Sequence, residues 1–447
     1  MKRLNIETLF SLGYKSDYPQ RQLLLGYLVY SILGTLLLSL PFCCRDGISI
    51  VDNLFSAVSA LSTTGLSTVD VSSDYTFWGQ LVILLLIQLG GLGYMTFSSY
   101  VMFRLTRHLG TNEARMFHAQ FSFPDKMRSD NMLGNIVNFA LAFEIMGVLL
   151  LYPYFLLHDV DNPLWSAVFH SVSAFCTAGF SIFSDNLMHF QTDWYVNIVI
   201  AILSYMGAMG FIMMTDVLRK LRHHEYRISF TTKVIAVITT GLTCWSTLHL
   251  FFFEPTIQGM PTANRLLASW FHSMSAITTV GFNTIDTSTV CAVTMIVLSF
   301  SMYIGASPSG TGGGLKSTTL SALYAYTKNK LGLRKDISLA GNKVPTYRVD
   351  AALTTAVFYT SILVVGIYLL TLFEGDRQCF LDIVFEATSA LATAGLSSGI
   401  LSSIGIGSKL VLIVLMFIGR VGVITLGNVM LVRASAESAK RRSDLVV

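Results

Sequence analysis

One short segment recurs four times along this chain of 447 residues, and no other feature constrains the fold as strongly. The copies share a Phe, a Ser followed by Ala, a Thr and a Gly at matching positions. They are LFSAVSALSTTGLSTV (54–69), VFHSVSAFCTAGFSIF (168–183), WFHSMSAITTVGFNTI (270–285) and VFEATSALATAGLSSG (384–399). Self-similarity of this kind marks a duplicated supersecondary unit. Four copies that each end in a glycine turn can close into a ring with pseudo-four-fold symmetry.

The composition places this ring in a membrane. Hydrophobic residues make up 53% of the chain and charged residues 13%, far from the balance of a soluble domain. Apolar runs of about 20 residues, long enough to cross a bilayer, recur along the chain. We expect eight spans, at about 22–43, 77–103, 132–157, 194–218, 231–253, 290–325 with an interruption, 350–373 and 408–432. The sequence therefore predicts an all-α polytopic membrane protein.

The whole chain, 1–447, is predicted to form a single membrane pore domain with a short tail. Each copy of the motif lies between two spans, which gives four membrane–pore–membrane repeats. We place the repeats at about 20–105, 130–220, 230–328 and 348–433, and a cytoplasmic C-terminal tail at 434–447. The apolar part of each motif is about a dozen residues, too short to cross the bilayer. It must enter and return, as four re-entrant pore helices.

The first copy illustrates what each re-entrant segment should look like. Its pattern suits a short helix from Phe55 to Thr63, which Gly65 then breaks because glycine accepts the positive φ of a turn at a helix C-terminus. Each helix C-terminus contributes on the order of 1 kcal/mol toward holding a cation. Backbone carbonyls in the turns can replace the water of the ion. The alternative is that the four glycines only allow helices to pack closely.

The candidate ion-binding residues are the Thr and Gly of each turn. They are Thr63, Gly65, Thr177, Gly179, Thr279, Gly281, Thr393 and Gly395.

The basic residues predict the orientation. They gather before the first span, after the second, fourth and sixth spans, and at the end of the chain, whereas the opposite loops hold few. By the positive-inside rule both termini are cytoplasmic. The net charge of +4 reflects this asymmetry, so we expect no nucleic-acid partner. The six cysteines show no metal-binding spacing, and we expect them to be buried packing residues.

The sixth span is interrupted by a second notable segment, YIGASPSGTGGGLKST (303–318). No α-helix runs through this composition, so at membrane depth the segment must be enclosed by protein or water. A phosphate loop needs Gly directly before Lys, and here Leu315 intervenes. The residues singled out are Gly305, Ser307, Pro308, Ser309, Gly310, Thr311, Gly312, Gly313, Gly314 and Lys316.

Arg420 lies inside the apolar run of the eighth span, where a charge costs roughly 2.5–3.5 kcal/mol. Two interpretations remain. Arg420 forms an ion pair with Glu144 or Asp216, or it faces the pore beneath the turns as a barrier to cations and a partner of the 303–318 segment. Gly419 and Gly422 would then let that segment approach closely.

The other charged candidates are ambiguous. Lys316 either belongs to the interrupting segment or extends to the cytoplasmic interface. Acids follow the turns on the extracellular side, where they either concentrate cations or are simply solvated loop residues. These acids are Asp70, Asp74, Asp185, Asp193 and Asp286.

With these motifs the chain resembles the Trk/Ktr/HKT superfamily of potassium transporters, most closely its Ktr-type membrane (pore) subunits. The Trk-type members carry two further N-terminal spans that are missing here. The resemblance implies that Gly65, Gly179, Gly281 and Gly395 line a selectivity filter. Some plant relatives have Ser in the first repeat and are sodium-permeable, so potassium is the implied ion. Leu or Phe follows each glycine, unlike TVGYG filters, which implies a short filter.

The resemblance also implies how transport is controlled. The 303–318 segment corresponds to an intramembrane gate loop. The expected assembly is a homodimer in a bacterial inner (plasma) membrane, bound on its cytoplasmic side to a ring of nucleotide-binding RCK regulatory subunits. Sodium is implied as an activator.

Two other classes of protein remain as alternatives. A sodium- or proton-coupled symporter needs a second ion site with buried acids, for which Glu144, Asp216 and Glu386 are candidates. A membrane-embedded enzyme needs a nucleophile with a base or a metal set, and the sequence shows neither. His170 and His272 follow the fixed Phe of their repeats and are expected to pack against neighbouring helices.

Overall fold

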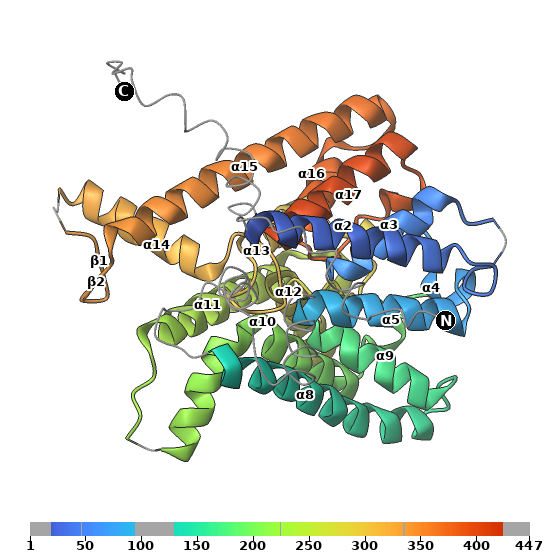
Figure 1. Ribbon diagram of the computed structural model, residues 1–447, viewed down its shortest axis with the longest axis horizontal. Coiled ribbons are helices and arrows are strands. Elements are labelled where there is room, and N and C mark those ends of the chain that lie inside the picture. The colour runs from blue at the N-terminus through green and yellow to red at the C-terminus, as the bar shows by residue number, and fades with distance from the viewer. Residues whose placement is uncertain (1–18, 46, 94–128, 224, 334–335, 423–447) are drawn as a thin grey trace, which may run out of the picture.

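The computed structural model describes residues 19–45, 47–93, 129–223, 225–333 and 336–422, which are mostly helical (Figure 1). The longer helices are α2 (Pro19–Leu38), α5 (Phe77–Leu92), α8 (Ser129–Leu157), α10 (Trp194–Arg222), α11 (Phe230–Phe253), α13 (Ala292–Ile304), α14 (Ser317–Leu331), α15 (Thr346–Glu374) and α17 (Ile406–Val421). Four shorter helices, which we call the pore helices, are α3 (Ile50–Leu61), α9 (Pro163–Phe175), α12 (Thr262–Thr278) and α16 (Phe380–Leu391).

Smaller elements complete the described chain. A one-turn helix α4 (Val71–Asp74) follows the first repeat motif, and a two-stranded antiparallel hairpin, β1 (Ser338–Leu339) and β2 (Asn342–Lys343), lies between α14 and α15. Short 3-10 turns are η1 (Met188–Phe190), η2 (Pro255–Ile257), η3 (Thr287–Thr289), η4 (Gly375–Arg377) and η5 (Ile400–Ser402).

The helix lengths and composition are those of a multi-pass membrane protein. Within the described residues, four helical stretches are long and apolar enough to cross a bilayer: Gly134–Leu157, Trp194–Arg222, Phe230–Phe253 and Thr346–Glu374. The expected sixth span is indeed interrupted, because α13 ends at Ile304 and helix resumes only at Ser317. Residues 94–103 and 423–432 of two expected spans, and the expected tail at 434–447, lie outside the described residues.

Each pore helix packs between the two longer helices that flank it in sequence: α3 between α2 and α5, α9 between α8 and α10, α12 between α11 and α13, and α16 between α15 and α17. Each repeat also contacts the next through its second long helix. The contacts run from α5 to α9, from α10 to α12, from α13 to α16, and from α17 back to α3. The last contact returns to the first repeat, so the pore helices are linked in a closed cycle.

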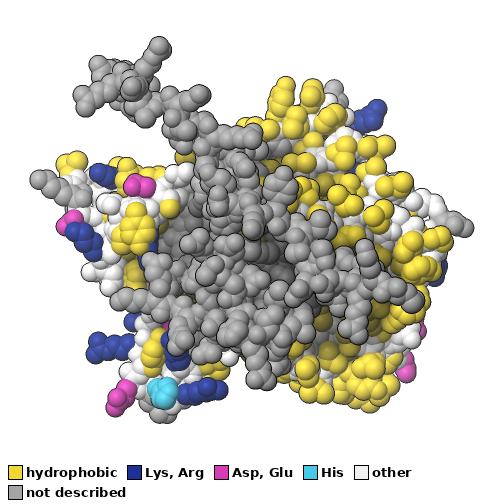
Figure 2. Space-filling model, in the orientation of Figure 1, with side chains coloured by type: hydrophobic (Ala, Val, Ile, Leu, Met, Phe, Trp, Pro, Cys, Tyr) yellow, Lys and Arg dark blue, Asp and Glu magenta, His cyan; other side chains and the backbone are white. Residues whose placement is uncertain are grey.

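The core surrounds the pore helices. The fixed Phe of each motif is completely buried, at Phe55, Phe169, Phe271 and Phe385. Large apolar side chains on the long helices are instead exposed, as at Leu149 and Val364, and Figure 2 shows hydrophobic side chains across much of the described surface. An apolar exterior around a buried core rich in Ser and Thr matches a protein whose outside faces lipid.

The second long helix of each repeat breaks at a glycine with positive φ. Gly93 (φ 79°) follows α5, Gly210 (φ 76°) interrupts α10, Gly305 (φ 65°) follows α13 and Gly422 (φ 91°) follows α17. Such φ values are accessible to glycine at little steric cost. Each break lies in the C-terminal half of its helix or directly after the helix ends.

The cysteines are all free, and the expectation that they are packing residues holds for only part of the set. Cys43 and Cys176 are buried, whereas Cys244 and Cys379 are exposed.

Candidate functional site

The pore helices end in four nearly identical turns. In each, the amide following the Thr donates to the carbonyl of the fixed Ser. These bonds are Thr64–Ser59 (2.8 Å), Ala178–Ser173 (2.8 Å), Val280–Ser275 (3.1 Å) and Ala394–Ser389 (2.8 Å). This reverse bond closes the helix C-terminus and satisfies one of its free carbonyls. The helix of the first repeat therefore ends at Leu61, two residues before the expected Thr63.

The threonine of each turn, rather than only the glycine, adopts the left-handed conformation. Its φ is 53° at Thr63, 51° at Thr177, 54° at Thr279 and 47° at Thr393. A positive φ is unusual for a β-branched residue and persists only where the surroundings impose it. Sequence reasoning missed this strain because a Thr in an apolar, helix-like run carries no signal for it.

The glycine of each turn has the positive φ expected from the sequence, and it also brings the turns together. The values are 92° at Gly65, 65° at Gly179, 86° at Gly281 and 82° at Gly395. A Cβ on each glycine would collide with a backbone oxygen of another repeat. The collisions are Gly65 with Ala178, Gly179 with Val280, Gly281 with Ala394, and Gly395 with Thr64. The four turns thus touch head to tail and close a ring.

The ring carries backbone oxygens without protein partners. Within the described part of the chain, no carbonyl of the three residues from Thr to Gly in any of the four turns accepts a hydrogen bond. The Thr of every turn is completely buried. Buried carbonyls are normally paired, so a cluster of free ones requires a partner of another kind. A cation that sheds its water is such a partner.

The segment from Gly305 to Lys316 forms a compact loop on the α13 side of the ring. Its base is closed by backbone bonds from Ala306 N to Gly313 O (3.1 Å) and from Leu315 N to Tyr303 O (2.9 Å). Gly305 (φ 65°) and Gly314 (φ 78°) lie so close that a Cβ on either would meet the backbone of the other. The glycine content of the segment therefore permits this narrow base.

The loop docks against the break in α10. Ser307 N donates to Ala208 O (3.3 Å), Thr311 N donates to Gly207 O (3.1 Å), and Phe211 N donates to Ser309 O (3.4 Å). A Cβ on Gly210 would collide with Ser309 and Gly310. The broken helix and the loop thus complete each other's backbone hydrogen bonds, as irregular backbone at membrane depth requires.

The tip of the loop hydrogen-bonds to two of the four turns and packs against a third, since a Cβ on Gly313 would collide with Ala392 O and Thr393 Oγ1. Thr177 Oγ1 donates to Thr311 Oγ1 (3.0 Å), and Gly313 N donates to Thr279 Oγ1 (2.7 Å). Thr63 Oγ1 and Thr393 Oγ1 are buried and have no partner in the described residues. Within the described residues the threonine hydroxyls thus bind the loop at the second and third turns, whereas the fourth turn contacts it by packing alone.

Arg420 contacts backbone carbonyls rather than acids. Its guanidinium donates to Thr311 O in the loop and to Gly90 O and Gly91 O at the end of α5. The ion pair with Glu144 or Asp216 is not formed: Glu144 accepts from Gln88, and Asp216 is bound elsewhere. Of the two interpretations, the structure therefore favours the contact with the loop.

Gly419, one of the two glycines beside Arg420, does not face the loop as expected. A Cβ on Gly419 would collide with Leu391 O at the end of α16, so Gly419 permits close packing of α17 against the pore helix of its own repeat. Gly90 and Gly207 stand in the same relation to the carbonyls of Leu61 and Phe175.

Lys316 turns back onto the loop instead of extending outward. Its Nζ donates to Gly312 O and Gly313 O, and the residue has a positive φ of 84°. Lys316 thus braces the loop from within, and Arg420 binds it from α17; both donate to main-chain oxygens of the loop.

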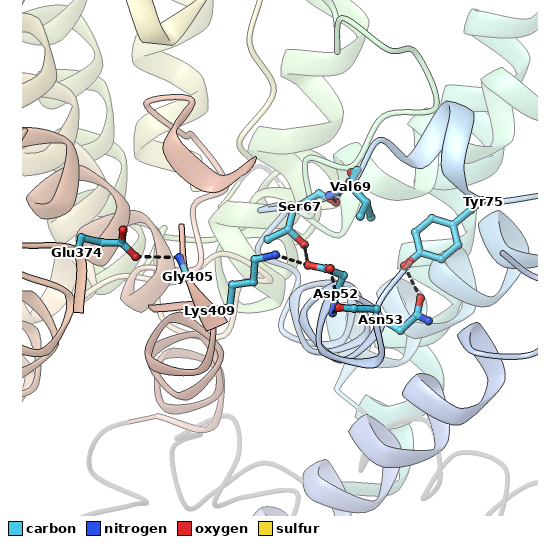
Figure 3. Close-up of polar contacts among 10 residues, drawn as sticks. Asp52, Asn53, Ser67, Val69, Tyr75, Glu374, Gly405 and Lys409 are labelled. Carbon is cyan, nitrogen blue, oxygen red and sulfur yellow. Dashed lines mark hydrogen bonds and ion pairs between the residues drawn. The ribbon is translucent and has the colours of Figure 1, made fainter. Parts of the chain in front are cut away.

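An ion pair joins the first and fourth repeats at the start of α3. Lys409 Nζ on α17 lies 2.6 Å from Asp52 Oδ1 in the first turn of α3, and both side chains are 15% exposed (Figure 3). Partial burial alone would raise the pKa of Asp52, but hydrogen bonds from Lys409, Thr68 and Ser49 outweigh it and lower that pKa.

Most acids expected at an outer vestibule act as helix caps. Asp70 caps α4, Asp193 caps α10 and Asp286 caps η3, each by accepting a backbone amide, and Asp74 accepts the amide of Asp70. Capping by a carboxylate satisfies the free amides at a helix start and suits the helix dipole.

The family of the chain follows from comparison with known proteins. The family model described as TrkH, a cation transport protein, matches residues 31–440. The chain therefore belongs to the TrkH family of cation transport proteins, which are transporters and not enzymes.

Curated relatives agree over nearly the full length. The chain is 32% identical to Ktr system potassium uptake protein B of Vibrio alginolyticus, over 96% of this chain and 94% of the relative. It is 32% identical to the Ktr system potassium uptake protein B of Bacillus subtilis, over 91% and 92%. It is 30% identical to the potassium/sodium uptake protein NtpJ of Enterococcus hirae, over 94% of each chain.

A solved structure shares the fold. The crystal structure of the potassium transporter TrkH from Vibrio parahaemolyticus aligns with 93% of this chain and 85% of that one, at a TM-score of 0.75 and 21% identity. At this identity the match shows the fold alone.

Proposed function

We propose that this protein moves potassium ions across a membrane through the ring of four turns. The chain is one membrane domain of four repeats around this pore, with eight spans and four re-entrant pore helices. The ion sheds water at the ring, where the carbonyls of residues 63–65, 177–179, 279–281 and 393–395 form a short selectivity filter. The relatives named as potassium uptake proteins support potassium as the ion.

The observation that carries the proposal is the closed ring of free carbonyls. Each glycine abuts a carbonyl of another repeat, and the oxygens from Thr to Gly accept no hydrogen bond in the described chain. Glycines that only allowed helices to pack would not require these oxygens to stay unpaired. The pore helices end at this ring, and their C-terminal dipoles favour a cation there.

The loop from Gly305 to Lys316 is the gate. It lies against the turns through Thr311 and Gly313, and Arg420 holds it by Thr311. A positive guanidinium beside the ion path also repels cations. Opening requires the loop to leave the filter threonines and the Arg420 contact.

The surroundings follow from charge and from the relatives. Basic residues end α10 (Arg219, Lys220, Arg222) and α14 (Lys328, Lys330), and Figure 2 shows charged side chains gathered near these ends. This side faces the cytoplasm of a bacterial cell, together with both termini. There a homodimer of this chain binds a ring of nucleotide-binding regulatory subunits.

Sodium is the second ion of interest, because one relative is named a potassium/sodium uptake protein. Sodium acts here as an activator of potassium uptake. A coupled symporter is the competing function. Two of its candidate acids are already occupied by protein hydrogen bonds, since Glu144 binds Gln88 and Asp216 binds Thr232.

The test is potassium-limited growth and ion uptake in a bacterial host that lacks its own potassium uptake systems. Gly281→Ser places a side chain against Ala394 O at a φ of 86°, so it must distort the ring. We expect the KM for potassium to rise about tenfold, equivalent to about 1.4 kcal/mol, and sodium uptake to rise relative to potassium uptake.

Gly241→Ser is the matched control. Gly241 lies on α11 with nothing within 4 Å of an added Cβ, so the same substitution there should leave both measurements unchanged. If Gly281→Ser and Gly241→Ser behave alike while both proteins reach the membrane, the filter assignment is wrong.

A further inference from the structure

The chain that leaves each filter glycine, which we call the descending limb, is fastened to the pore helix of its own repeat. In the second repeat, His170 Nε2 lies 2.9 Å from Ser181 Oγ, two residues after the glycine. In the third repeat, the amide of Ile285 donates to His272 Nε2 at 3.4 Å. Both imidazoles are completely buried. The histidines pack among helices as expected, as where His170 meets Phe155 of α8, and they also hold the limb.

Glu386 occupies the same motif position in the fourth repeat, directly after the fixed Phe. Its Oε1 accepts from Ser397 Oγ (2.6 Å), Ser398 N (2.8 Å) and Ser398 Oγ (3.2 Å). The side chain is 1% exposed, and its Oε2 has no hydrogen-bond partner in the described residues. All the hydrogen bonds of this carboxyl group therefore go to the descending limb.

In the first repeat the limb is also fastened to its pore helix, but by a residue at a different motif position. Ser56 stands where the His and Glu stand elsewhere, and its hydroxyl makes no hydrogen bond to its limb. Asp52 lies four residues earlier, on the same face of α3. Its Oδ1 accepts from Thr68 Oγ1 (2.6 Å), three residues after the glycine. Lys409 of the fourth repeat holds this carboxylate in place, as Figure 3 shows.

The fixed serines divide the ring into two halves. In the second and third repeats the Ser hydroxyl donates to the carbonyl directly after the glycine: Ser173 Oγ to Phe180 O (2.8 Å) and Ser275 Oγ to Phe282 O (2.7 Å). The hydroxyls of Ser59 and Ser389 are buried without a partner in the described residues. We call the turns followed by Phe180 and Phe282 the Phe half, and those followed by Leu66 and Leu396 the Leu half.

Each limb of the Phe half thus has two ties to its own pore helix, whereas each limb of the Leu half is tied to its pore helix through one carboxyl group. The fourth limb also accepts a hydrogen bond from Thr287 Oγ1 of the third repeat at Ser397 O. The position of a limb sets where the preceding carbonyls lie. A filter discriminates between ions by the spacing and the stiffness of such carbonyls. A limb with a single tie to its own pore helix therefore concentrates that control in one side chain.

We propose that Glu386 and Asp52 are specificity-determining positioning residues, which hold the Leu half of the filter at the spacing that favours potassium over sodium. The inference rests on the proposed function, because it assumes that the ring is the filter. Neither carboxyl group touches the ion. Each acts through the limb that it holds.

The test compares substitutions at one motif position. Glu386→Ala removes all three bonds to the limb, so we expect the KM for potassium to rise about fivefold and the ratio of sodium to potassium uptake to rise with it. Glu386→Gln keeps an oxygen that accepts from Ser397 and Ser398, and it should stay within about twofold of the parent protein. Ser56→Ala is the matched control, at the position that binds no limb, and should change neither quantity.

Ser397→Ala is a milder variant, which keeps the test decisive if Glu386→Ala fails to fold. It removes the bond from Ser397 Oγ, leaves the one from Ser398 N, and should shift both quantities in the same direction by a smaller amount. Membrane abundance and thermal unfolding of each purified variant accompany the uptake measurements. A variant that folds and lowers only the maximal rate, with KM and ion ratio unchanged, contradicts the inference.

Gly281→Ser separates failure of this inference from failure of the proposed function. If Gly281→Ser alters ion preference while Glu386→Ala and Ser397→Ala match Ser56→Ala, the filter stands and the positioning role is refuted. If Gly281→Ser is also silent, the proposed function fails, and this inference fails with it.

Discussion

The two halves of the ring share one backbone conformation but differ in the side-chain hydrogen bonds that hold it. In the Phe half the threonine hydroxyls of Thr177 and Thr279 bind the gate loop, and fixed serines tie the limbs. In the Leu half the hydroxyls of Thr63 and Thr393 have no partner in the described chain. The Phe half thus supplies the threonine hydrogen bonds to the loop proposed as the gate. The Leu half contacts this loop by packing of Gly313 against Ala392 and Thr393, and Arg420 of the fourth repeat links the loop to the first repeat.

This difference teaches that repetition and asymmetry serve separate purposes. In the proposed function one ion contacts all four turns at once, which requires the backbone turns to be alike. The side chains behind them are free to differ, because among the described residues the loop proposed as the gate comes from the third repeat alone. Substitutions in the backbone turns should therefore act equally in both halves, and substitutions in the supporting side chains should not.

The largest expected effect comes from the turn glycines, and it should appear in both halves of the ring. Gly179→Ala in the Phe half and Gly395→Ala in the Leu half both place a Cβ against a neighbouring carbonyl at positive φ. We expect each to raise the KM for potassium about tenfold. Uptake assays at a series of potassium concentrations measure this. A severe effect in one half and none in the other would contradict a shared ring.

The next effect concerns the contact that joins the halves. Arg420→Gln removes the charge and most of the hydrogen bonds to Thr311, Gly90 and Gly91. Hydrogen bonds from a charged group contribute about 1.5–3 kcal/mol each, so losing even one should raise the open fraction of the gate about tenfold. Initial rates of potassium efflux from proteoliposomes report this fraction. A rate equal to that of the parent protein argues against Arg420 as a latch.

Substitution of one threonine in each half tests directly whether the two halves differ in their hydrogen bonds to the loop. Thr279→Val leaves Gly313 N without its acceptor while the gate is docked, which should cost the closed state about 1 kcal/mol and raise the efflux rate about fivefold. Thr393→Val makes the same change of shape at a similar φ, but its hydroxyl has no partner to lose in the described chain. Equal efflux rates in the two variants would show that the gate does not distinguish the halves.

The smallest effect concerns the stability of the Leu half. Lys409→Met removes the partner of Asp52, and a partly exposed pair contributes about 1 kcal/mol or less. The pKa of Asp52 is lowered in the folded protein, so the pair stabilises fully above the ordinary carboxyl pKa. This stabilisation is lost as the pH falls through the lowered value.

Thermal unfolding in detergent measures this pair. The parent protein should exceed Lys409→Met in melting temperature at pH 7, and the gap should close only in strongly acidic buffer. A gap that closes near pH 6 would mean that another group controls the effect.

The multi-pass membrane character and the interruption between Ile304 and Ser317 could be predicted from the sequence, because apolar length and glycine-rich breaks are local signals. The positive φ of Gly65 and its counterparts followed from the same reasoning. The strained φ of Thr63 and its counterparts did not, because it results from the closing of each turn against its own helix. The bounds of the four repeats stay a prediction.

The hydrogen-bond partners of the buried polar side chains could not be predicted from the sequence. Arg420 binds carbonyls of α5 and of the gate loop, and main-chain oxygens leave no trace in the side-chain pattern. The limb contacts of His170 and Glu386 could not be predicted from the sequence, for a related reason. They occupy one motif position with unlike residue types, and only the structure shows that both face the same limb.

The most direct test of the ring is to locate the ion. Crystals of the protein grown in rubidium, which replaces potassium and scatters anomalously, should show a peak on the axis of the ring. Carbonyls from all four Thr-to-Gly turns should surround it, and the peak should be lost in Gly281→Ser. An empty ring with rubidium bound elsewhere along the chain would contradict the account.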